Sequence, residues 1–205
     1  MLSPSRREDP KKASAFRALL LLVGAVSLGI VRVPAVKAAD VPPSRQVVIV
    51  LRALAYDGNL KSRAGPTVNI AILHKKGNSA AEQMGAAVTQ AFMSRQSTLV
   101  TGLPIAISRL AYRTPDELKN SIVESGIDLL YVCDGLESDL DAIKEITRQA
   151  KVLSVGANRE QVEKGLSLGV VEMDGKVAIL VNLQSSRLEG VSFSSDFLGL
   201  TSVIR

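Results

Sequence analysis

The chain has 205 residues and a formal net charge of +5, with one cysteine, one histidine and no tryptophan. The basic excess lies in residues 1–38, which hold 7 of the 25 basic and 2 of the 20 acidic side chains, so the remainder is neutral. A neutral chain gives no electrostatic support for binding nucleic acid or an anionic membrane. One cysteine excludes an intramolecular disulfide, and one histidine leaves no His/Cys cluster for a transition metal.

Residues 1–38 have the pattern of a secretory signal peptide. Basic side chains within residues 6–17 precede an uncharged run over residues 18–31, and Val36 and Ala38 suit a cleavage site. This run of 14 residues is shorter than the roughly 20 that span a bilayer. We therefore expect cleavage before Ala39 and a periplasmic protein with the length of one domain. Retention of the segment as a membrane anchor is the alternative.

Residues 39–66 are interpreted as an N-terminal lead. Pro42-Pro43 indicates an extended start, and the following residues 47–56 are apolar and rich in β-branched side chains. Such a run favours a strand by propensity, although a helix is also possible.

Strand and helix patterns alternate from about residue 67. Apolar runs at 68–73, 105–110, 129–133 and 152–155 indicate strands. Capping signals at Ser79, at Thr114-Pro115 and at Ser138 indicate helices, which we expect to reach Ser94 after the first signal and Gln149 after the third. This alternation predicts parallel strands covered by helices on both faces.

The C-terminal residues predict a different arrangement. Strands over 168–172 and 176–181 are joined by Asp174-Gly175, a pair typical of a tight hairpin turn. Asn182 is expected to cap a helix over 183–189 that ends at Gly190. A second helix begins at Ser194-Ser195, with apolar residues at helical spacing: Phe197, Leu198, Leu200 and Val203.

The sequence therefore predicts a single α/β domain. We expect a mainly parallel sheet with helices on both faces, a C-terminal antiparallel hairpin at the sheet edge, and two short helices after the hairpin.

The order of these C-terminal signals resembles the YfiR-like family of small periplasmic proteins. The resemblance rests on Gly165 before the hairpin, Asn182-Leu183 at the end of its second strand, and Gly-Val-Ser-Phe-Ser-Ser-Asp-Phe-Leu-Gly-Leu over residues 190–200. It implies a YfiR-like domain over residues 67–205 and a helix over residues 47–56, so we expect residues 39–66 to form a short lead followed by a helix. Family members commonly carry cysteine pairs, which this chain does not have.

The resemblance also implies a function. YfiR-like proteins are similar to non-enzymatic repressors that bind the periplasmic sensor region of a membrane-bound diguanylate cyclase, and relatives occur beside sensor kinases. We therefore expect a signalling regulator of the periplasm, connected with cyclic di-GMP signalling, that binds an inner-membrane protein and no nucleic acid. The binding of a small solute in the periplasm is the alternative function.

Candidate ligand-binding residues follow the first secure strand. His74, Lys75, Asn78 and Ser79 lie between that strand and a helix N-terminus, where lysines and backbone amides can hold an anion. An ordinary solvated turn is the alternative. A solute-binding protein would form its pocket from this loop and residues 134–138. No glycine-rich nucleotide motif and no Gly-x-Ser-x-Gly elbow is present, so we expect no enzymatic activity, no cofactor and no metal site.

Candidate partner-binding residues lie in the last predicted strand and the turn after its helix. The strand is apolar on both faces, so Leu180 must be covered either by the chain's own terminal helix or N-terminal element, or by a partner or second copy in a homodimer. The predicted contact surface comprises Leu180, Asn182, Phe193, Phe197 and Leu198. The single thiol, Cys133, ends a buried apolar run and is interpreted as a small core residue.

Overall fold

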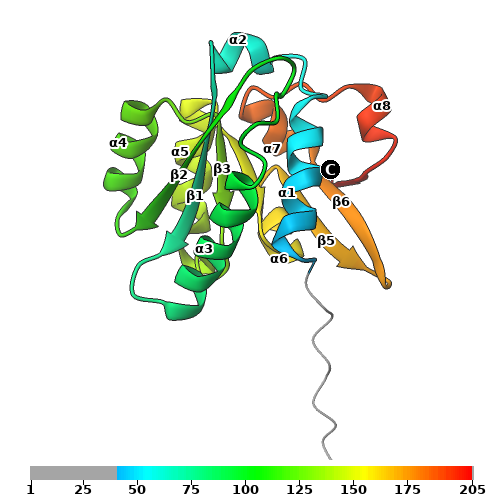
Figure 1. Ribbon diagram of the computed structural model, residues 1–205. Helices are drawn as coiled ribbons and strands as arrows, with labels where there is room; N and C mark the ends of the chain where they lie inside the picture. The colour runs from blue at the N-terminus through cyan, green and yellow to red at the C-terminus, as the bar shows by residue number, and fades with distance from the viewer. Residues whose placement is uncertain (1–40, 205) are drawn as a thin grey trace, which may run out of the picture. The chain divides into compact units, whose positions relative to one another are not determined.

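Seven strands form one sheet in the order β2-β1-β3-β4-β5-β6-β7 in the computed structural model, which describes residues 41–204 (Figure 1). The strands are β1 Val68–Lys75, β2 Ile105–Tyr112, β3 Leu129–Val132, β4 Leu153–Gly156, β5 Leu168–Met173, β6 Lys176–Asn182 and β7 Ser202–Ile204. Strands β1 to β5 are parallel, β6 is antiparallel to β5, and β7 is parallel to β6. The predicted α/β class and mainly parallel sheet are confirmed.

Helices cover both faces of this sheet, as expected. They are α1 Pro43–Leu54, α2 Leu60–Ala64, α3 Ser79–Met93, α4 Pro115–Ser125, α5 Leu140–Ala150, α6 Arg159–Glu163, α7 Leu183–Leu188 and α8 Ser195–Leu198. In Figure 1, α1 and α3 lie on the viewer's side of the sheet and α5 lies behind it. The described residues, 41–204, belong to one compact unit. The predicted signal peptide, its cleavage site before Ala39, and Arg205 lie outside the described residues.

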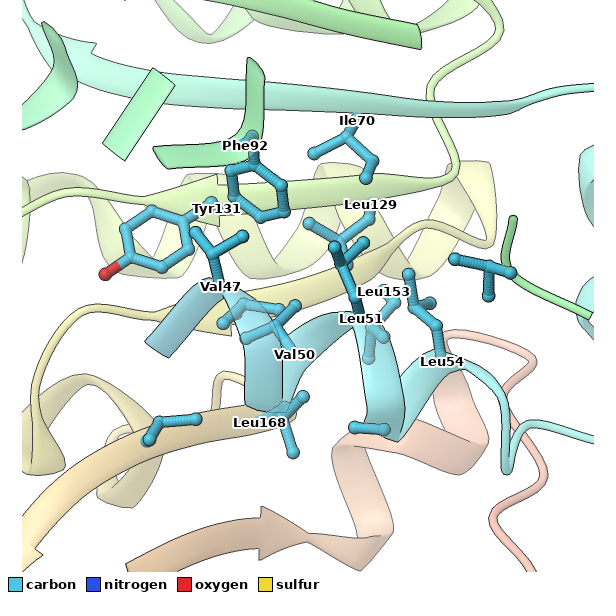
Figure 2. Packing of buried hydrophobic residues seen from close by; sticks show 14 of the residues in the cluster. Val47, Val50, Leu51, Leu54, Ile70, Phe92, Leu129, Tyr131, Leu153 and Leu168 are labelled. Carbon is cyan, nitrogen blue, oxygen red and sulfur yellow. The ribbon is translucent and has the colours of Figure 1, made fainter. Parts of the chain in front are cut away.

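The element after Pro42-Pro43 is a helix, and it begins earlier than expected because Pro43 takes the first helical turn, where its missing N–H costs nothing. Its buried residues Val47, Val50, Leu51 and Leu54 have helical spacing. Figure 2 shows these four side chains pointing from α1 toward the sheet. The period of the apolar pattern therefore outweighs the β-branched preference for a strand.

The opposite face of the sheet has its own core. Leu118 and Ile122 of α4 and Ile143 of α5 pack with Leu73 and Leu130, whereas α1 and α3 pack on the alternate side chains of the same strands. Cys133 lies in the core on the α1 side with no exposed surface, and burial is the main cause that raises the pKa of its thiol to about 12. The interpretation of Cys133 as a buried core residue is confirmed.

Two helix starts differ from the predictions. Asn78, not Ser79, caps α3, and its side chain accepts a hydrogen bond from the Ala81 N–H at 3.1 Å. A short 3₁₀ turn, Glu137–Asp139, precedes α5, so Ser138 is not its cap. At α3 a neighbouring polar residue also satisfies the rule for a cap, and it is the one used. At α5 the residue before the helix, Asp139, makes no side-chain cap hydrogen bond.

The C-terminal hairpin forms as expected, with positive φ at both turn residues, 51° at Asp174 and 74° at Gly175. Asn182 caps α7 and Ser194 caps α8. Helix α8 ends at Leu198, however, and Val203 lies in strand β7, so the prediction of a longer helix through Val203 is wrong. Residues 202–204 form a strand and not a helix because they pair with the outer edge of β6.

Strand β7 changes the edge of the sheet. It pairs with Leu180–Asn182, so this part of the hairpin is not at the edge. The first half of β6, residues 176–179, has no strand on that side within residues 41–204. The expectation of a hairpin at the edge is therefore correct only for the first half of β6.

Candidate functional site

A cleft lies at the carboxyl ends of β1, β3 and β4, beneath the start of α1. It has two adjoining compartments of about 350 and 520 Å³ that share Val41, Gln46, Asp134 and Ala157. We call it the strand-end cleft, and its remaining lining residues are Pro43, Asn78, Ala80, Ala81, Met84, Gly135, Glu137, Asn158, Arg159, Glu160, Val170, Val171 and Glu172.

The sheet order explains why a cleft lies here. Strand β1 continues into α3 on one face of the sheet, and the neighbouring β3 continues toward α5 on the other face. The two connections leave in opposite directions, which opens a crevice between the strand ends, the usual ligand position in open α/β sheets.

One wall of the strand-end cleft is fixed by a buried polar pair. Gln46 of α1 is 4% exposed, its side-chain Nε2 donates to the Val41 carbonyl at 2.9 Å, and its Oε1 accepts from the Tyr131 hydroxyl at the end of β3. The pair ties the first turn of α1 to the sheet. A glutamine among apolar helix residues was the signal for it, and our sequence analysis missed it.

The opposite wall is fixed by the first turn of α6. Asn158 caps α6 by accepting from the Gln161 N–H at 2.9 Å, and its Nδ2 donates to Oδ1 of Asp134 at 2.7 Å. Gln161 is buried, accepts from the Ala157 N–H at 2.8 Å and donates to the Cys133 carbonyl at 3.1 Å. Helix α6 was not predicted, because five residues are too few for a periodic signal.

The structure separates the four predicted ligand residues. Asn78 lines the strand-end cleft, together with the Asp134–Gly135 loop, so the two loops named for a solute pocket meet as expected. Ser79 is exposed at the start of α3 and is not among the lining residues.

The other two residues, His74 and Lys75, do not line the cleft. His74 is 5% exposed and packs against Gly85, and burial is the main cause that lowers its pKa. Lys75 makes an ion pair with Asp139 at 2.6 Å and lies 5.2 Å above the centre of the Tyr112 ring. These contacts occupy both side chains within the fold, so the proposed anion site is not assembled from this loop.

The residues expected to contact a partner are mostly part of the core. Leu180 is 3% exposed and packs against Val162 of α6 and Val171 of β5, so the chain's own helix covers it and the expectation of a partner there is corrected. The covering helix is α6, not the terminal helix or the N-terminal element. Phe193 and Phe197 are buried, with ring centres 4.9 Å apart.

Asn182 and Leu198 complete this predicted surface. Asn182 is used as a cap: its Oδ1 accepts from the Ser185 N–H at 3.0 Å, and its Nδ2 donates to the Val162 carbonyl at 3.4 Å. Leu198 is half-buried against the main core. Of the five residues, only Leu198 keeps substantial exposed apolar surface.

A second hollow lies next to the free half of β6. We call it the edge groove; its volume is about 570 Å³, and it is lined by Arg45, Ile49, Met173, Asp174, Lys176, Val177, Ala178, Ile179, Leu200 and Ser202. Leu200 is 71% exposed at its rim. Helix α1 therefore contributes to both hollows, Gln46 to the strand-end cleft and Ile49 to the edge groove.

Two kinds of feature are absent from the described part of the chain. Within residues 41–204 there is no group of three or more His, Cys, Asp or Glu side chains placed to hold a metal ion. No helix in this same range combines the length and apolar character needed to cross a membrane.

The fold and the sites define a single-sheet α/β protein with a strand-end cleft. A family model described as YfiR/HmsC-like matches residues 49–202, and the chain belongs to this family. Membership supports a regulatory protein of the periplasm in general terms. A search of curated proteins gave no match.

Solved structures of bacterial proteins share this fold at low sequence identity. A domain in complex with L-Trp from Streptococcus pneumonia has a TM-score of 0.54 and 13% identity, and a conserved domain protein from Vibrio cholerae has 0.55 and 13%; each match covers 80% of this chain. A substrate-binding protein with adhesive properties from Clostridium difficile has a TM-score of 0.49 and 17% identity over 72% of this chain. The matches span 60%, 60% and 57% of those proteins. At these identities the likeness shows the fold alone.

Proposed function

We propose that this protein is a non-enzymatic periplasmic regulator that binds the periplasmic region of an inner-membrane signalling protein, a diguanylate cyclase or a sensor kinase, through the edge groove. Family membership supports the general role. The observation that carries the proposal is that the first half of β6 has no strand on its outer side within residues 41–204 and lies beside the exposed side chain of Leu200.

The edge groove suits an extended segment of a partner. Residues 176–179 have backbone groups at a sheet edge without a neighbouring strand in the described range, and an added strand can pair with such groups. Val177 and Ile179 are half-buried, and Leu200 offers an apolar contact on the rim. A free apolar edge of this kind would otherwise favour self-association.

The proposed contact keeps Leu198 from the surface first expected and adds the neighbouring residues Leu200 and Ile179. Leu180 and the phenylalanines hold the C-terminal elements in place, while Leu198, Leu200 and Ile179 present the apolar surface. Regulation then follows from binding linkage: the protein favours one conformation of the sensor, and a signal that weakens binding releases it.

Site-specific cross-linking tests this proposal. Cys133 is buried, so a Leu200→Cys variant carries one accessible thiol to which a photoactivatable cross-linker can be attached. The matched control is Val123→Cys on α4, where the side chain is 69% exposed. We expect the Leu200 variant alone to form an adduct in envelope preparations with an inner-membrane protein that carries a cyclase or kinase domain.

Three outcomes would contradict the proposal. An adduct with only twice the mass of the chain would assign the groove to a homodimer. Equal adducts from the Leu200 and Val123 positions, or none from either, would show that the edge groove is not a specific contact.

Small-solute binding is the second candidate function, and the strand-end cleft at the crossover of β1 and β3 favours it. The similar fold of the L-Trp complex is compatible with this function. Native mass spectrometry of protein isolated gently from the periplasm tests it, because a carried solute adds a defined mass that denaturation removes. A chain without added mass, and without binding to any solute offered, would argue against it.

A further inference from the structure

The outer side of β6 presents main-chain groups to a further strand. The Asn182 N–H donates to the carbonyl of Ser167, next to β5, at 2.9 Å, so the main-chain groups of Asn182 point toward β5. Because these groups alternate in direction along a strand, those of Val177 and Ile179 point to the outer side. No strand pairs with them there within residues 41–204. The N–H and C=O of both residues are therefore open to a partner.

Apolar side chains form a floor beside this edge. Val177 and Ile179, together with Ile49 of α1, pack against the main core and line the edge groove. Leu200 lies at the rim and is 71% exposed. Successive side chains of a strand point to opposite faces, so a strand added here turns every second side chain toward α1 and this floor.

The charges of the edge groove are mostly positive. The exposed side chains of Arg45 and Lys176 line it, against one carboxylate, Asp174. None of the three forms an ion pair or a side-chain hydrogen bond with another residue of the described range 41–204. Arg52 follows Arg45 by two turns of α1, and this helix has no acidic residue. A segment that carries carboxylates is therefore attracted.

The shape of the edge argues against a second copy of this chain as the occupant. Only residues 176–179 are free, between the turn at Asp174-Gly175 and the part of β6 that pairs with β7. A two-fold dimer would pair this stretch with itself in antiparallel fashion. The turn of each copy would then reach the position that β7 occupies in the other, and their basic side chains would approach each other. A single extended segment meets neither obstacle.

We propose that the segment bound in the edge groove is an extended, acidic strand of the partner. It pairs with the outer main-chain groups of Val177 and Ile179, turns alternate apolar side chains toward α1, and holds a carboxylate against Arg45 and Lys176. The proposal deepens the proposed function and rests on it for the identity of the partner. The strand and the charge are requirements of the groove, so they are measured without that partner.

Three peptides with blocked ends test the charge requirement. Their sequences are Asp-Val-Thr-Val-Asp, Asn-Val-Thr-Val-Asn and Lys-Val-Thr-Val-Lys, so either strand direction places an end residue at the basic side chains. Amide NMR shifts of the isotope-labelled mature protein detect binding at millimolar concentration. We expect the Val177 and Ile179 signals to move, and the Asp peptide to bind about fivefold more tightly than the Asn peptide and the Lys peptide to bind most weakly. Equal affinities would overturn the acidic class, and unmoved signals would overturn the site.

A fourth peptide tests strand pairing. It has the Asp sequence with N-methyl groups on its three internal residues, which keeps the charge but removes the main-chain donors that face β6. We expect no detectable binding of this peptide. An affinity equal to that of the unmethylated Asp peptide would show that the groove does not add a strand.

A double variant tests the two cations. Arg45→Gln with Lys176→Gln removes both charges at exposed positions, so we expect an unchanged melting temperature and equal affinities for the Asp and Asn peptides. Lys119→Gln, an exposed lysine of α4, is the control and should keep the preference of the wild type. A double variant that keeps the preference would overturn the role of these two residues.

Cross-linking from Leu200 separates this proposal from the proposed function. If the adduct with the membrane sensor forms and the peptides show no charge preference, the proposed function stands and the acidic class is wrong. If no adduct forms but the Asp peptide moves the Val177 and Ile179 signals, the groove takes an acidic strand of another protein and the proposed function is wrong. If neither is observed, both are wrong.

Discussion

Glu189 at the end of α7 provides the sharpest test of the core. Its side chain has no exposed surface. Its Oε1 accepts from the Thr147 hydroxyl at 2.7 Å, and its Oε2 accepts from the Ser154 N–H at 2.8 Å and from the Ser167 hydroxyl. Burial raises the pKa of this carboxyl group above its ordinary value, and the hydrogen bonds oppose the rise.

The surroundings can accept the protonated form without losing a hydrogen bond. The Thr147 hydroxyl also lies 3.1 Å from the Lys144 carbonyl. If Thr147 donates to that carbonyl, its oxygen can accept a hydrogen bond from the protonated carboxyl group of Glu189. The amide of a glutamine would make the same contact, so Glu189→Gln preserves the network and removes the cost of burying a charge.

The sign of the pH effect follows from linkage. A carboxyl group with a raised pKa in the folded chain binds more protons there than in the unfolded chain, so stability falls as pH rises from about 4.5 through the folded pKa. We expect Glu189→Gln to be more stable than the wild type at pH 7 to 8, and the difference to vanish near pH 4.5. Urea unfolding across this range measures it.

Truncation of the Glu189 side chain should instead lower the stability. Glu189→Ala leaves the Ser154 N–H and the Ser167 hydroxyl without the acceptor they use, at about 1 to 3 kcal/mol for each unpaired group. We expect a loss of about 2 to 6 kcal/mol. The shifts of His74 and Asp128 also act on stability, but both groups are present in the wild type and the variants, so the comparison removes them. A glutamine variant less stable than the wild type at pH 7 would refute the reasoning.

Three further predictions concern the core and the N-terminus. Leu180→Glu places a charge against Val162, so it should cost several kcal/mol of stability and unfold the domain. Leu200→Glu, at an exposed position, should change the stability by about 0.5 kcal/mol or less. Thermal melting compares the two variants, and a stable Leu180 variant would show that α6 does not cover this position. Cys133→Ser should cost no more than about 1 to 3 kcal/mol, and reductant should leave the melting temperature of the wild type unchanged; a shift would indicate an intermolecular disulfide. The mature chain should begin at Ala39 by intact mass of a periplasmic extract, and a retained Met1 would indicate an anchored protein.

The candidate sites were only partly accessible to prediction. Asn78 and residues 134–135 were named for a pocket because loops after parallel strands meet at one end of a sheet, and they do. His74 and Lys75 were named for their position in the same loop. Their direction depends on which face of β1 each side chain occupies and on the partners there, Gly85 for one and Asp139 for the other.

Leu180 shows the limit most clearly. Its strand is apolar on both faces, and the sequence correctly required that Leu180 be covered. The element that covers Leu180 could not be predicted from the sequence, because α6 has only five residues and no periodic pattern. Strand β7, which pairs with the same part of β6, was missed because its residues also have helical spacing. Packing against Val162 and pairing of residues 202–204 with β6 are long-range contacts that no local pattern contains.

The sequence by itself determined the alternation of strands and helices, the α/β class, the tight turn at Asp174-Gly175 and the caps at Thr114, Asn182 and Ser194. These features depend on local backbone preferences and on apolar periodicity, both of which are set by residues close together in the sequence. Only the tertiary structure decided the sheet order, the position of the strand-end cleft, the edge groove and the buried setting of Glu189. Each of these results from segments far apart in the chain that meet because they bury the same apolar surface.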